Sequence, residues 1–460
     1  MRRFSVALAA AVALVFTLPA GAQERASALP LPQLAKCERR AHPQLPPKWR
    51  ATFLLAPFTK AQLVLAEIAH DAALAATRIK VYGLEHGSAD LFIIGSSTYE
   101  LRSDGASLAA CRNLGDTGWR ALPRDWVART AKCVGSAPIA EMAVEWWKVP
   151  TDPAPSTNWI WLKASDRTPF RLLFERPSDR LAILSRHALS HQIAFAAAPD
   201  VDLSGVAATC KAEKTHAPIG RDALAEVFAR MERAADRAET DIKRLVPELE
   251  ASCPTTPLPD WPDQFVTTAI MTPIDADSMP MPAEVIYNWH LKSQRTRMFW
   301  PDKSPIRSED ALLIGPDGYE VIRNRSGNLA CHGSLPGVLK ANWPTVAPCT
   351  CAGAIRGTTP LTPYGSTRIL NCPMTAPRVA WAWFTNEGRP ILFMETSSSS
   401  DPGGGLLAVV DYHAWAPGAA ITDAALAKPA QCRGSRQAQP ARRGDENQCP
   451  ACHLGGATAP

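Results

Sequence analysis

The sequence predicts an α+β fold in which two tandem, duplicated antiparallel β-sheet domains are joined by an amphipathic helix. Each domain is expected to be a curved sheet or half-barrel with a helical cover. Three observations support this: residues recur after about 220 positions, short alternating strands with turn residues fill both halves, and one amphipathic segment lies between them. With 460 residues, 46% of them hydrophobic, the chain is long enough for two domains with a core each.

Matched residues define the duplication. Gly95, Tyr99, Glu100 and Cys111 recur as Gly315, Tyr319, Glu320 and Cys331, in each case 220 positions later (331 − 111). Trp159 and Trp161 recur as Trp381 and Trp383. The octapeptide LAILSRHA at 181–188 recurs as LAVVDYHA at 407–414, which matches His187 with His413. This spacing exceeds that of a solenoid repeat, so it indicates two copies of one domain.

Residues 1–22 have the pattern of a signal peptide. Arg2 and Arg3 precede an apolar core, and Ala20-Gly21-Ala22 supplies small residues at a cleavage site. The core is too short to predict a membrane span. We therefore expect a periplasmic or secreted chain, in which residues 23–48 form a polar, extended lead-in.

Copy one is expected at 49–198. Its predicted strands lie at 62–68, 78–82, 90–94, 99–102, 107–111, 159–163, 170–174 and 181–195. Asp104-Gly105 and Thr168-Pro169 supply turns between consecutive strands. Consecutive hairpins imply an antiparallel sheet, and the apolar face of such a sheet needs a second layer.

Residues 199–258 are expected to form a helical linker. Within it, residues 221–245 carry apolar side chains at helical spacing, with Asp222 near the start and Pro247 beyond the end. An apolar stripe of this kind favours packing on a sheet. A lid or a spacer between the copies is the alternative.

Copy two is expected at 259–418, with strands at 284–291, 295–300, 311–314, 319–322, 378–384, 390–395 and 406–415. The last segment, 419–460, contains cysteines and turns to Gln, Arg, Pro and Gly from Pro429 onward. Such a composition is typical of a mobile tail.

The twelve cysteines of an exported chain favour disulfides, and no residue pattern predicts a metal site. The candidates are Cys111, Cys133, Cys210, Cys253, Cys331, Cys349, Cys351 and Cys372. We expect Cys111 to pair with Cys133. In copy two, Cys331 would pair with Cys349 or Cys351, and Cys372 would take the other.

The tail carries a CxxCH motif in Cys449, Cys452 and His453. This spacing attaches c-type haem through two thioethers, with the histidine as an axial ligand. A haem protein in electron transfer is therefore one alternative function. The other interpretation of the motif is a thiol pair or a disulfide, with Cys432 as a further partner. No other cofactor is expected.

The paired tryptophans are the main candidates for ligand binding. Alternation along a strand places Trp159 and Trp161 on one face, and likewise Trp381 and Trp383. They either belong to the core or line a concave surface for an apolar or aromatic ligand. His187 and His413 are further candidates, although a histidine that ends an apolar strand is more often structural.

Composition and motifs argue against other classes of function. The net charge of +5 comes without a dense Lys/Arg run outside the tail, which argues against a nucleic-acid surface. No GxSxG, HExxH or P-loop motif is present, so nothing nominates catalytic residues. An enzyme with a site between sheet and helix remains the third alternative.

Several short motifs resemble those of the periplasmic lipoprotein carriers of the LolA/LolB type. They are Asp104-Gly105, Asp317-Gly318, Gly388-Arg389-Pro390 with ILF following, and Ile183-Leu184 or Val409-Val410. The resemblance implies a curved sheet over a helical lid that holds acyl chains, with no catalytic residues. The family has one copy, so the duplication is a departure from it. On these grounds we expect an exported, soluble binding protein for an apolar or aromatic ligand, released to an envelope partner protein.

Overall fold

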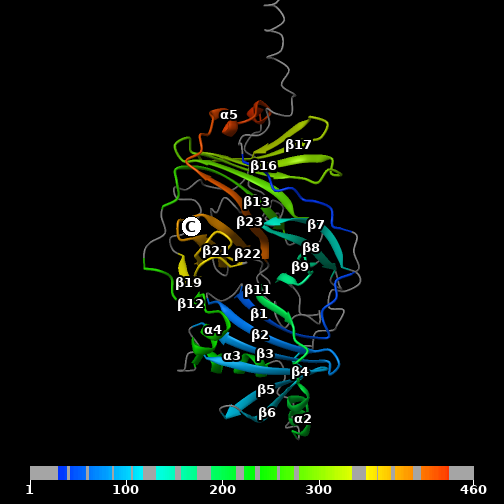
Figure 1. Cartoon of the computed structure of the whole chain (residues 1–460). Helices are drawn as coiled ribbons and strands as arrows, with labels where there is room; N and C mark the ends of the chain where they lie inside the picture. The colour runs from blue at the N-terminus through cyan, green and yellow to red at the C-terminus, as the bar shows by residue number, and fades with distance from the viewer. Residues whose placement is uncertain are drawn as a thin grey trace, which may run out of the picture.

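The computed structural model describes residues 29–38, 42–57, 62–84, 87–104, 107–117, 131–150, 157–173, 188–213, 222–233, 239–255, 260–273, 279–333, 349–359, 361–373, 379–396 and 406–434. These residues form two large antiparallel sheets with few helices, as Figure 1 shows. The predicted fold class is therefore confirmed. The predicted signal peptide at 1–22 lies outside the described residues.

The first sheet has eleven strands. They are β1 (Lys48–Pro57), β2 (Val64–Asp71), β3 (Ala76–Gly83), β4 (Ser88–Ile94), β5 (Ser97–Asp104), β6 (Ser107–Gly115), β7 (Lys132–Ile139), β8 (Met142–Pro150), β9 (Thr157–Lys163), β10 (Pro169–Leu173) and β11 (Ala188–Ala197). Their order across the sheet is β6-β5-β4-β3-β2-β1-β11-β10-β9-β8-β7. The sheet is thus two meanders joined where β1 pairs with β11.

The second sheet repeats this order with one added edge strand. It contains β12 (Leu249–Glu250), β13 (Gln264–Pro273), β14 (Met281–Asn288), β15 (Ser293–Phe299), β16 (Ile306–Ile314), β17 (Asp317–Asn324), β18 (Leu329–Gly333), β19 (Thr350–Ile355), β20 (Thr367–Pro373), β21 (Val379–Thr385), β22 (Pro390–Thr396) and β23 (Leu406–Pro417). Apart from β12, the order of the strands across the second sheet is the same as in the first, so that β19 corresponds to β7, β13 to β1 and β18 to β6. The added strand β12 pairs with β19. In the first sheet the matching contact is the isolated bridge between Ala35 of the lead-in and Ser136 of β7.

β-bulges recur at matched places in the two sheets. The pairing of β1 with β11 skips Ile193, and the pairing of β13 with β23 skips His413. Bulges also recur between β9 and β10 and between β21 and β22. Because a bulge bends the strand and increases its twist, the repeated bulges bend the two sheets at matched positions. They also show that the structural counterpart of His413 is Ile193, so the predicted match with His187 is wrong.

Four disulfides repeat the duplication. Cys37–Cys133 and Cys111–Cys210 correspond to Cys253–Cys351 and Cys331–Cys432, and the fifth is Cys349–Cys372. All eight candidate cysteines are therefore bonded, but the predicted pairing of Cys111 with Cys133 is wrong. β6 and β7, which carry these residues, form opposite edges of the sheet. Pairing of Cys331 with Cys349 or Cys351 is wrong for the same reason, because β18 and β19, the strands that correspond to β6 and β7, lie at opposite sides of the second sheet. The expected bond of Cys372 with one of these two cysteines is confirmed, and the partner is Cys349.

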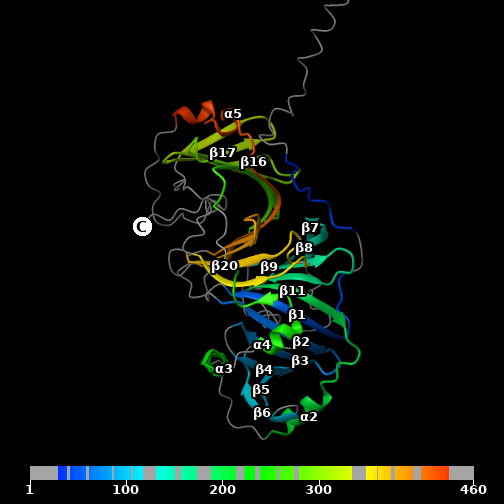
Figure 2. The same ribbon diagram turned by 60° about the vertical axis from the view of Figure 1, so that its left-hand side comes forward.

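The two sheets pack against each other through one face of each, which we call the interdomain face (Figure 1). Buried side chains from both copies form one apolar cluster there, including Leu54, Trp161, Ile270 and Trp383. Hydrogen bonds also cross the interface, since Trp146 Nε1 donates to Thr272 Oγ1 at 3.1 Å. The opposite face of each sheet is called the outer face. Figure 2 shows the second sheet curling around its outer face.

The described helices pack on the faces and the edges of the two sheets. They are α2 (Ser204–Ala212), α3 (Asp222–Arg233), α4 (Glu239–Leu245), α5 (Asp423–Leu426) and the 3₁₀ helix η1 (Ala430–Gly434). The predicted linker helix at 221–245 contains α3 and α4, with 234–238 outside the described residues. Arg230 of α3 pairs with Glu100 on the outer face, whereas Asp241 of α4 pairs with Lys80 on the interdomain face. The two helices therefore pack on opposite faces of the first sheet.

The predicted tail at 419–460 begins with ordered elements. α5 packs Ala425 and Leu426 against Val266 and Ile286 of the second sheet. Cys432 in η1 is fully buried and bonded to Cys331 of β18. The segment 419–434 thus covers the second sheet, and the rest of the tail lies outside the described residues.

Candidate functional site

The four tryptophans nominated from the sequence lie in the core between the two sheets. Trp159, Trp161 and Trp381 are 0% exposed and Trp383 is 2% exposed. As expected, both rings of each pair share one face, and that face is the interdomain face. These rings therefore belong to the core between the sheets, and among the described residues Trp383 lines a small pocket there of about 20 Å³.

Of the two nominated histidines, His187 lies outside the described residues. His413 is half-buried at the bulge of β23. Its carbonyl accepts hydrogen bonds from Arg389 at 3.0 Å and from Tyr364 at 3.3 Å. Burial, and then the neighbouring Arg389 charge, lower the pKa of the His413 ring. These contacts hold the backbone at the bulge.

The haem motif of Cys449, Cys452 and His453 lies outside the described residues, so haem attachment remains a prediction. The structure does exclude Cys432 as a partner for it, because Cys432 is bonded to Cys331. Ten of the twelve cysteines are in disulfides, which leaves Cys449 and Cys452 (12 − 10 = 2).

The outer face of the second sheet carries a cluster of aromatic side chains that is a candidate for ligand binding. At one end of it, aromatic rings contact one another. The ring centroids of Trp261 and Trp415 are 5.0 Å apart, those of Phe265 and Trp415 4.8 Å, and those of Phe265 and Tyr287 5.0 Å. Trp261 also meets Phe384 edge to face at 5.8 Å. Such pairs fix the rings relative to one another.

Small and flexible apolar side chains fill the middle of this face. Ala269, Ala283, Ala311 and Ala382 are buried there, together with methionines such as Met298. Trp289, Trp300, Phe393 and Trp415 pack around this cluster and are only half-buried. We call this set of residues, on the concave side of the second sheet in Figure 2, the aromatic face.

The aromatic face ends in polar side chains on β15, β16 and β17. Gln294 and Thr296 are 2% and 0% exposed, and Gln294 Nε2 donates to Thr296 Oγ1 at 3.2 Å. Glu309 and Glu320 follow on the next two strands, and the cross-strand register places both on this face. Burial, and then the charge of Glu320, raise the pKa of Glu309 to about 7. This carboxyl can therefore donate or accept a hydrogen bond near neutral pH.

The outer face of the first sheet is closed in a different way. Val227 and Met231 of α3 join its apolar cluster, and Trp49 and Trp147 are only 2% and 7% exposed. In the described part of the chain, no helix residue joins the cluster of the aromatic face. The two copies thus share a fold but differ in what covers the same face.

The residues of the aromatic face were missed by sequence reasoning, although a signal for them was present. Backbone hydrogen bonds in matched turns make Trp289 the counterpart of Ala72. In copy one the Ala75 amide donates to the carbonyl of Ala72, and in copy two the Lys292 amide donates to the carbonyl of Trp289. Trp300 likewise corresponds to Gly83 at the end of the third strand. The two tryptophans are thus a difference in residue type between matched positions of the two copies, visible once the copies are aligned.

Two further findings concern metal ions and membranes. No group of three or more His, Cys, Asp or Glu side chains among the described residues could hold a metal ion. No helix within the described ranges is long and apolar enough to cross a membrane. The five disulfides are typical of an oxidising compartment.

No protein-family model matches the chain. No curated protein matches it either. Among solved structures, the chain is similar to an uncharacterised conserved protein from Thermus thermophilus, at 13% identity and a TM-score of 0.25, over 37% of this chain and 87% of that one. It is similar to the MucA/MucB complex of Pseudomonas aeruginosa, at 10% identity and a TM-score of 0.22, over 62% and 86%.

A LolA superfamily protein from Nitrosomonas europaea is also similar, at 12% identity and a TM-score of 0.20, over 41% of this chain and 97% of that one. The resemblance to LolA-type carriers expected from the sequence is thus confirmed as a weak likeness. Nothing about ligand, partner or activity follows from likeness at these values.

Proposed function

We propose that the chain is an exported binding protein, periplasmic or secreted, that holds an apolar or aromatic ligand on the aromatic face. One observation carries the proposal. Trp289, Trp300, Phe393 and Trp415 surround a buried apolar cluster and are themselves half-buried, whereas the matched face of the first sheet is closed by α3.

Covering these rings would be favourable. Removing apolar surface from water contributes roughly 25 cal/mol per Å², and an aromatic ring adds about 0.5–1.5 kcal/mol when it meets another ring. Large apolar surfaces that remain exposed around a cluster are common in ligand sites. The buried side chains of Ala269, Ala283 and Ala311 form the floor of the cluster, and the half-buried rings at its margin would contact the ligand.

The polar end of the face supports an amphipathic ligand. Glu309 and Gln294 can hydrogen-bond a hydroxyl or amide group while the rings cover an apolar chain or ring. The ligand class is therefore a lipid-like or aromatic molecule with one polar end. An envelope partner protein would receive it, since soluble carriers release such ligands to a protein that shields them from water.

Binding of the fluorescent probe N-phenyl-1-naphthylamine to the mature protein tests the proposal. We expect saturable binding, which Trp289→Ala and Phe393→Ala each weaken by roughly 2- to 12-fold, the equivalent of one lost ring contact. Leu291→Ala is the matched control, because Leu291 is 38% exposed on the same hairpin as Trp289. Equal affinity in all three variants would refute this location.

Native mass spectrometry of the exported protein is the second test. Folded material should carry an extra mass that organic extraction removes and whose lipid or aromatic nature can be identified. A clean ligand-free mass in folded protein, together with no probe binding, would contradict the proposed function itself.

A further inference from the structure

A second site lies on the other side of the second sheet, away from the aromatic face. A pocket of about 440 Å³ opens between β15–β17 and the segment that carries α5 and η1. Its lining is dominated by four cations: Arg295, Arg297, Arg323 and Lys428. Figure 1 shows α5 lying beside β16 and β17 at the end of the molecule remote from the first sheet.

The carboxylates near this pocket do not balance its cations. Asp310 is 0% exposed and receives two hydrogen bonds from Arg297, at 2.8 and 3.0 Å. Glu284, opposite Arg297 on β14, is the second carboxylate. The lining itself contains four cations and no carboxylate, and with the two strand carboxylates Asp310 and Glu284 these groups sum to +2 (4 − 2).

Two guanidinium groups in the pocket lack hydrogen-bond partners for buried nitrogens. Arg295 Nε lies 3.5 Å and Arg323 Nε 3.8 Å from Asp310, which is too far for hydrogen bonds. Both Nε atoms are buried and neither has a partner. The Arg295 side chain is 7% exposed, and among the described residues it also approaches the carbonyl of Ala427 at 3.5 Å. Buried donors of this kind are costly unless something accepts from them.

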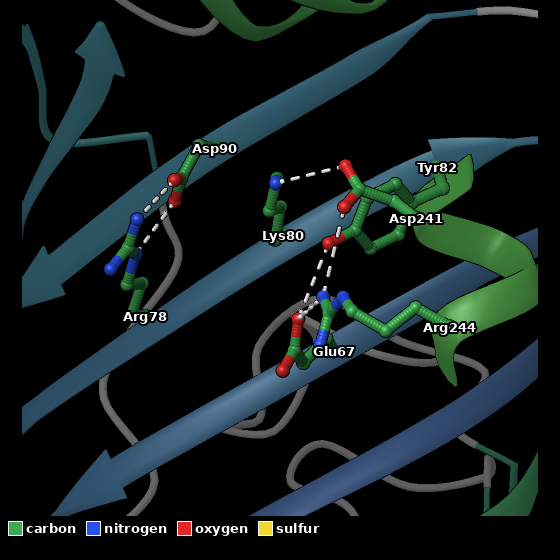
Figure 3. A network of polar contacts seen from close by, with 7 residues as sticks. All are labelled: Glu67, Arg78, Lys80, Tyr82, Asp90, Asp241 and Arg244. Atoms are coloured by element: carbon green, nitrogen blue, oxygen red, sulfur yellow. Dashed lines mark hydrogen bonds and ion pairs between the residues drawn. The ribbon is translucent and has the colours of Figure 1, made fainter. Parts of the chain in front are cut away.

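Copy one contains the same arrangement with an acceptor supplied by the chain. Strand register matches Lys80, Asp90 and Glu67 with Arg297, Asp310 and Glu284. There Arg78 occupies both oxygens of Asp90, and Lys80 donates to Asp241 of α4 at 3.2 Å. Figure 3 shows α4 placing Asp241 and Arg244 over this network.

In each copy, therefore, two strand cations lie near one aspartate, and the aspartate accepts both hydrogen bonds from one of them. In copy one, the linker helix adds the missing carboxylate. In copy two the roles of the two strand cations are exchanged, because Arg297, the counterpart of Lys80, holds Asp310. Arg295, the counterpart of Arg78, lines the pocket instead, where Arg323 and Lys428 add further positive charge.

We propose that this pocket binds an oxyanion of the phosphate-monoester class, whose oxygens accept from the strand cation that the aspartate does not serve, as the Asp241 carboxylate does in copy one. A phosphate monoester carries nearly two negative charges at neutral pH, which matches the local charge of +2. Planar guanidinium groups also bind phosphate oxygens in pairs. The pocket volume leaves space for an organic group beyond the phosphate.

The electrostatics of Arg295 agree with this assignment. Burial, opposed by Asp310 and reinforced by the Arg297 and Arg323 charges, lowers its pKa to about 10. A bound dianion would relieve this repulsion.

Calorimetric titration of the full mature protein with glycerol 3-phosphate, at constant ionic strength, tests the site. We expect saturable binding of one equivalent, weakened roughly 10-fold or more by Arg295→Gln combined with Arg323→Gln. Lys211→Gln is the control for net charge, because Lys211 is exposed on α2. Lys428→Gln at the half-buried rim provides a second variant should the arginine pair affect folding.

Vesicles of phosphatidic acid in phosphatidylcholine distinguish a lipid headgroup from a free phosphate monoester. Sedimentation of the protein with these vesicles, reduced in the same variants, would indicate a lipid source. The proposal is overturned if glycerol 3-phosphate, inorganic phosphate and the vesicles all bind no better than chloride, or if the pocket variants match Lys211→Gln. Probe binding at the aromatic face should be unchanged in these variants, so the two sites fail or succeed separately.

Discussion

Arg171 of the first sheet donates one hydrogen bond of 2.9 Å to each carboxylate oxygen of Asp411 in the second sheet. Both side chains are 4% exposed. Arg171 Nε also donates to His191 Nδ1 at 3.2 Å, and the His191 ring lies 4.4 Å from Trp383. This buried pair allows one alignment of the two sheets, because any sliding would leave two charges without partners.

Asp411→Ala should destabilise the protein by about 3–5 kcal/mol, because Arg171 would remain charged and buried. Urea unfolding followed by tryptophan fluorescence measures the effect. The exposed pair of Arg50 and Asp200 is the control, since Asp200→Ala should cost less than about 1 kcal/mol. Combining Arg171→Met with Asp411→Leu, which replaces both charges by apolar side chains, should restore most of the loss. Equal costs for Asp411→Ala and Asp200→Ala would show that the pair contributes nothing.

Stability should fall as the pH drops below about 6.5. Burial, and then the Arg171 charge, lower the pKa of His191 well below its usual value, and burial lowers the pKa of His70 to about 4. Both are neutral in the fold, so stability is present above 6.5 and is lost as the unfolded chain gains protons between pH 6.5 and 4. Each histidine contributes a slope of up to about 1.4 kcal/mol per pH unit.

Chemical unfolding at several pH values, with and without His191→Gln, measures this slope. His290→Gln is the control, because that side chain is 68% exposed. A slope that is the same in the wild type and in His191→Gln would contradict the assignment.

Much of the architecture could be predicted from residues that act locally. Gly95 and Gly315 have φ values of +58° and +56°, so glycine at these matched turns marks the hairpins in both copies. Alternation also placed each tryptophan pair on one face. It could not tell which face, because Trp159, Ile160, Trp161 and Leu162 are all 0% exposed. A strand that is buried on both sides has no polar face to reveal its orientation.

The disulfide pairs and the histidine match failed for a different reason, namely that they depend on long-range geometry. Cys111 meets Cys210 because α2 returns to β6, which sequence separation does not show. The octapeptides containing His187 and His413 are similar in sequence, but His187 lies outside the described residues and similarity of two short apolar segments does not fix a register. The bulge at His413 and Ile193 sets the true register.

Loss of Cys331–Cys432 should be more costly than loss of Cys349–Cys372. The sequence separations are 101 and 23 residues, and loop-closure entropy predicts a difference of about 1.3 kcal/mol in favour of the longer loop. Alanine substitution of both cysteines in each pair, followed by urea unfolding, compares them. Because Cys432 anchors η1 beside the cationic pocket, its loss should also weaken glycerol 3-phosphate binding, whereas loss of the short-loop disulfide should not. The reverse order of stability would contradict the entropic argument.

Asp241→Asn should cost less than about 1 kcal/mol, because its partner Lys80 and Asp241 itself are 30% and 40% exposed. Thermal unfolding measures this. Figure 3 places Tyr82 and Glu67 in the same network, and Tyr82 donates to Glu67 at 3.2 Å. A second substitution, Glu67→Gln, should therefore also weaken the bond to Tyr82. A cost of several kcal/mol for Asp241→Asn alone would show that α4 depends on this ion pair.

Glu309 provides a pH-dependent test of the aromatic face. Its pKa is raised to about 7 by burial and then by Glu320, so the protonated form is favoured in the fold. The stability that this proton contributes is present below the usual pKa of about 4.5 and is lost as the pH rises through 7. Glu309→Gln keeps the shape without the charge, so it should match the wild type at pH 5 and exceed it by on the order of 1 kcal/mol at pH 8. Urea unfolding at the two pH values measures the difference, with His290→Gln as an unrelated control. If the difference in unfolding free energy between the wild type and Glu309→Gln were the same at both pH values, the charge on Glu309 would not be its cause.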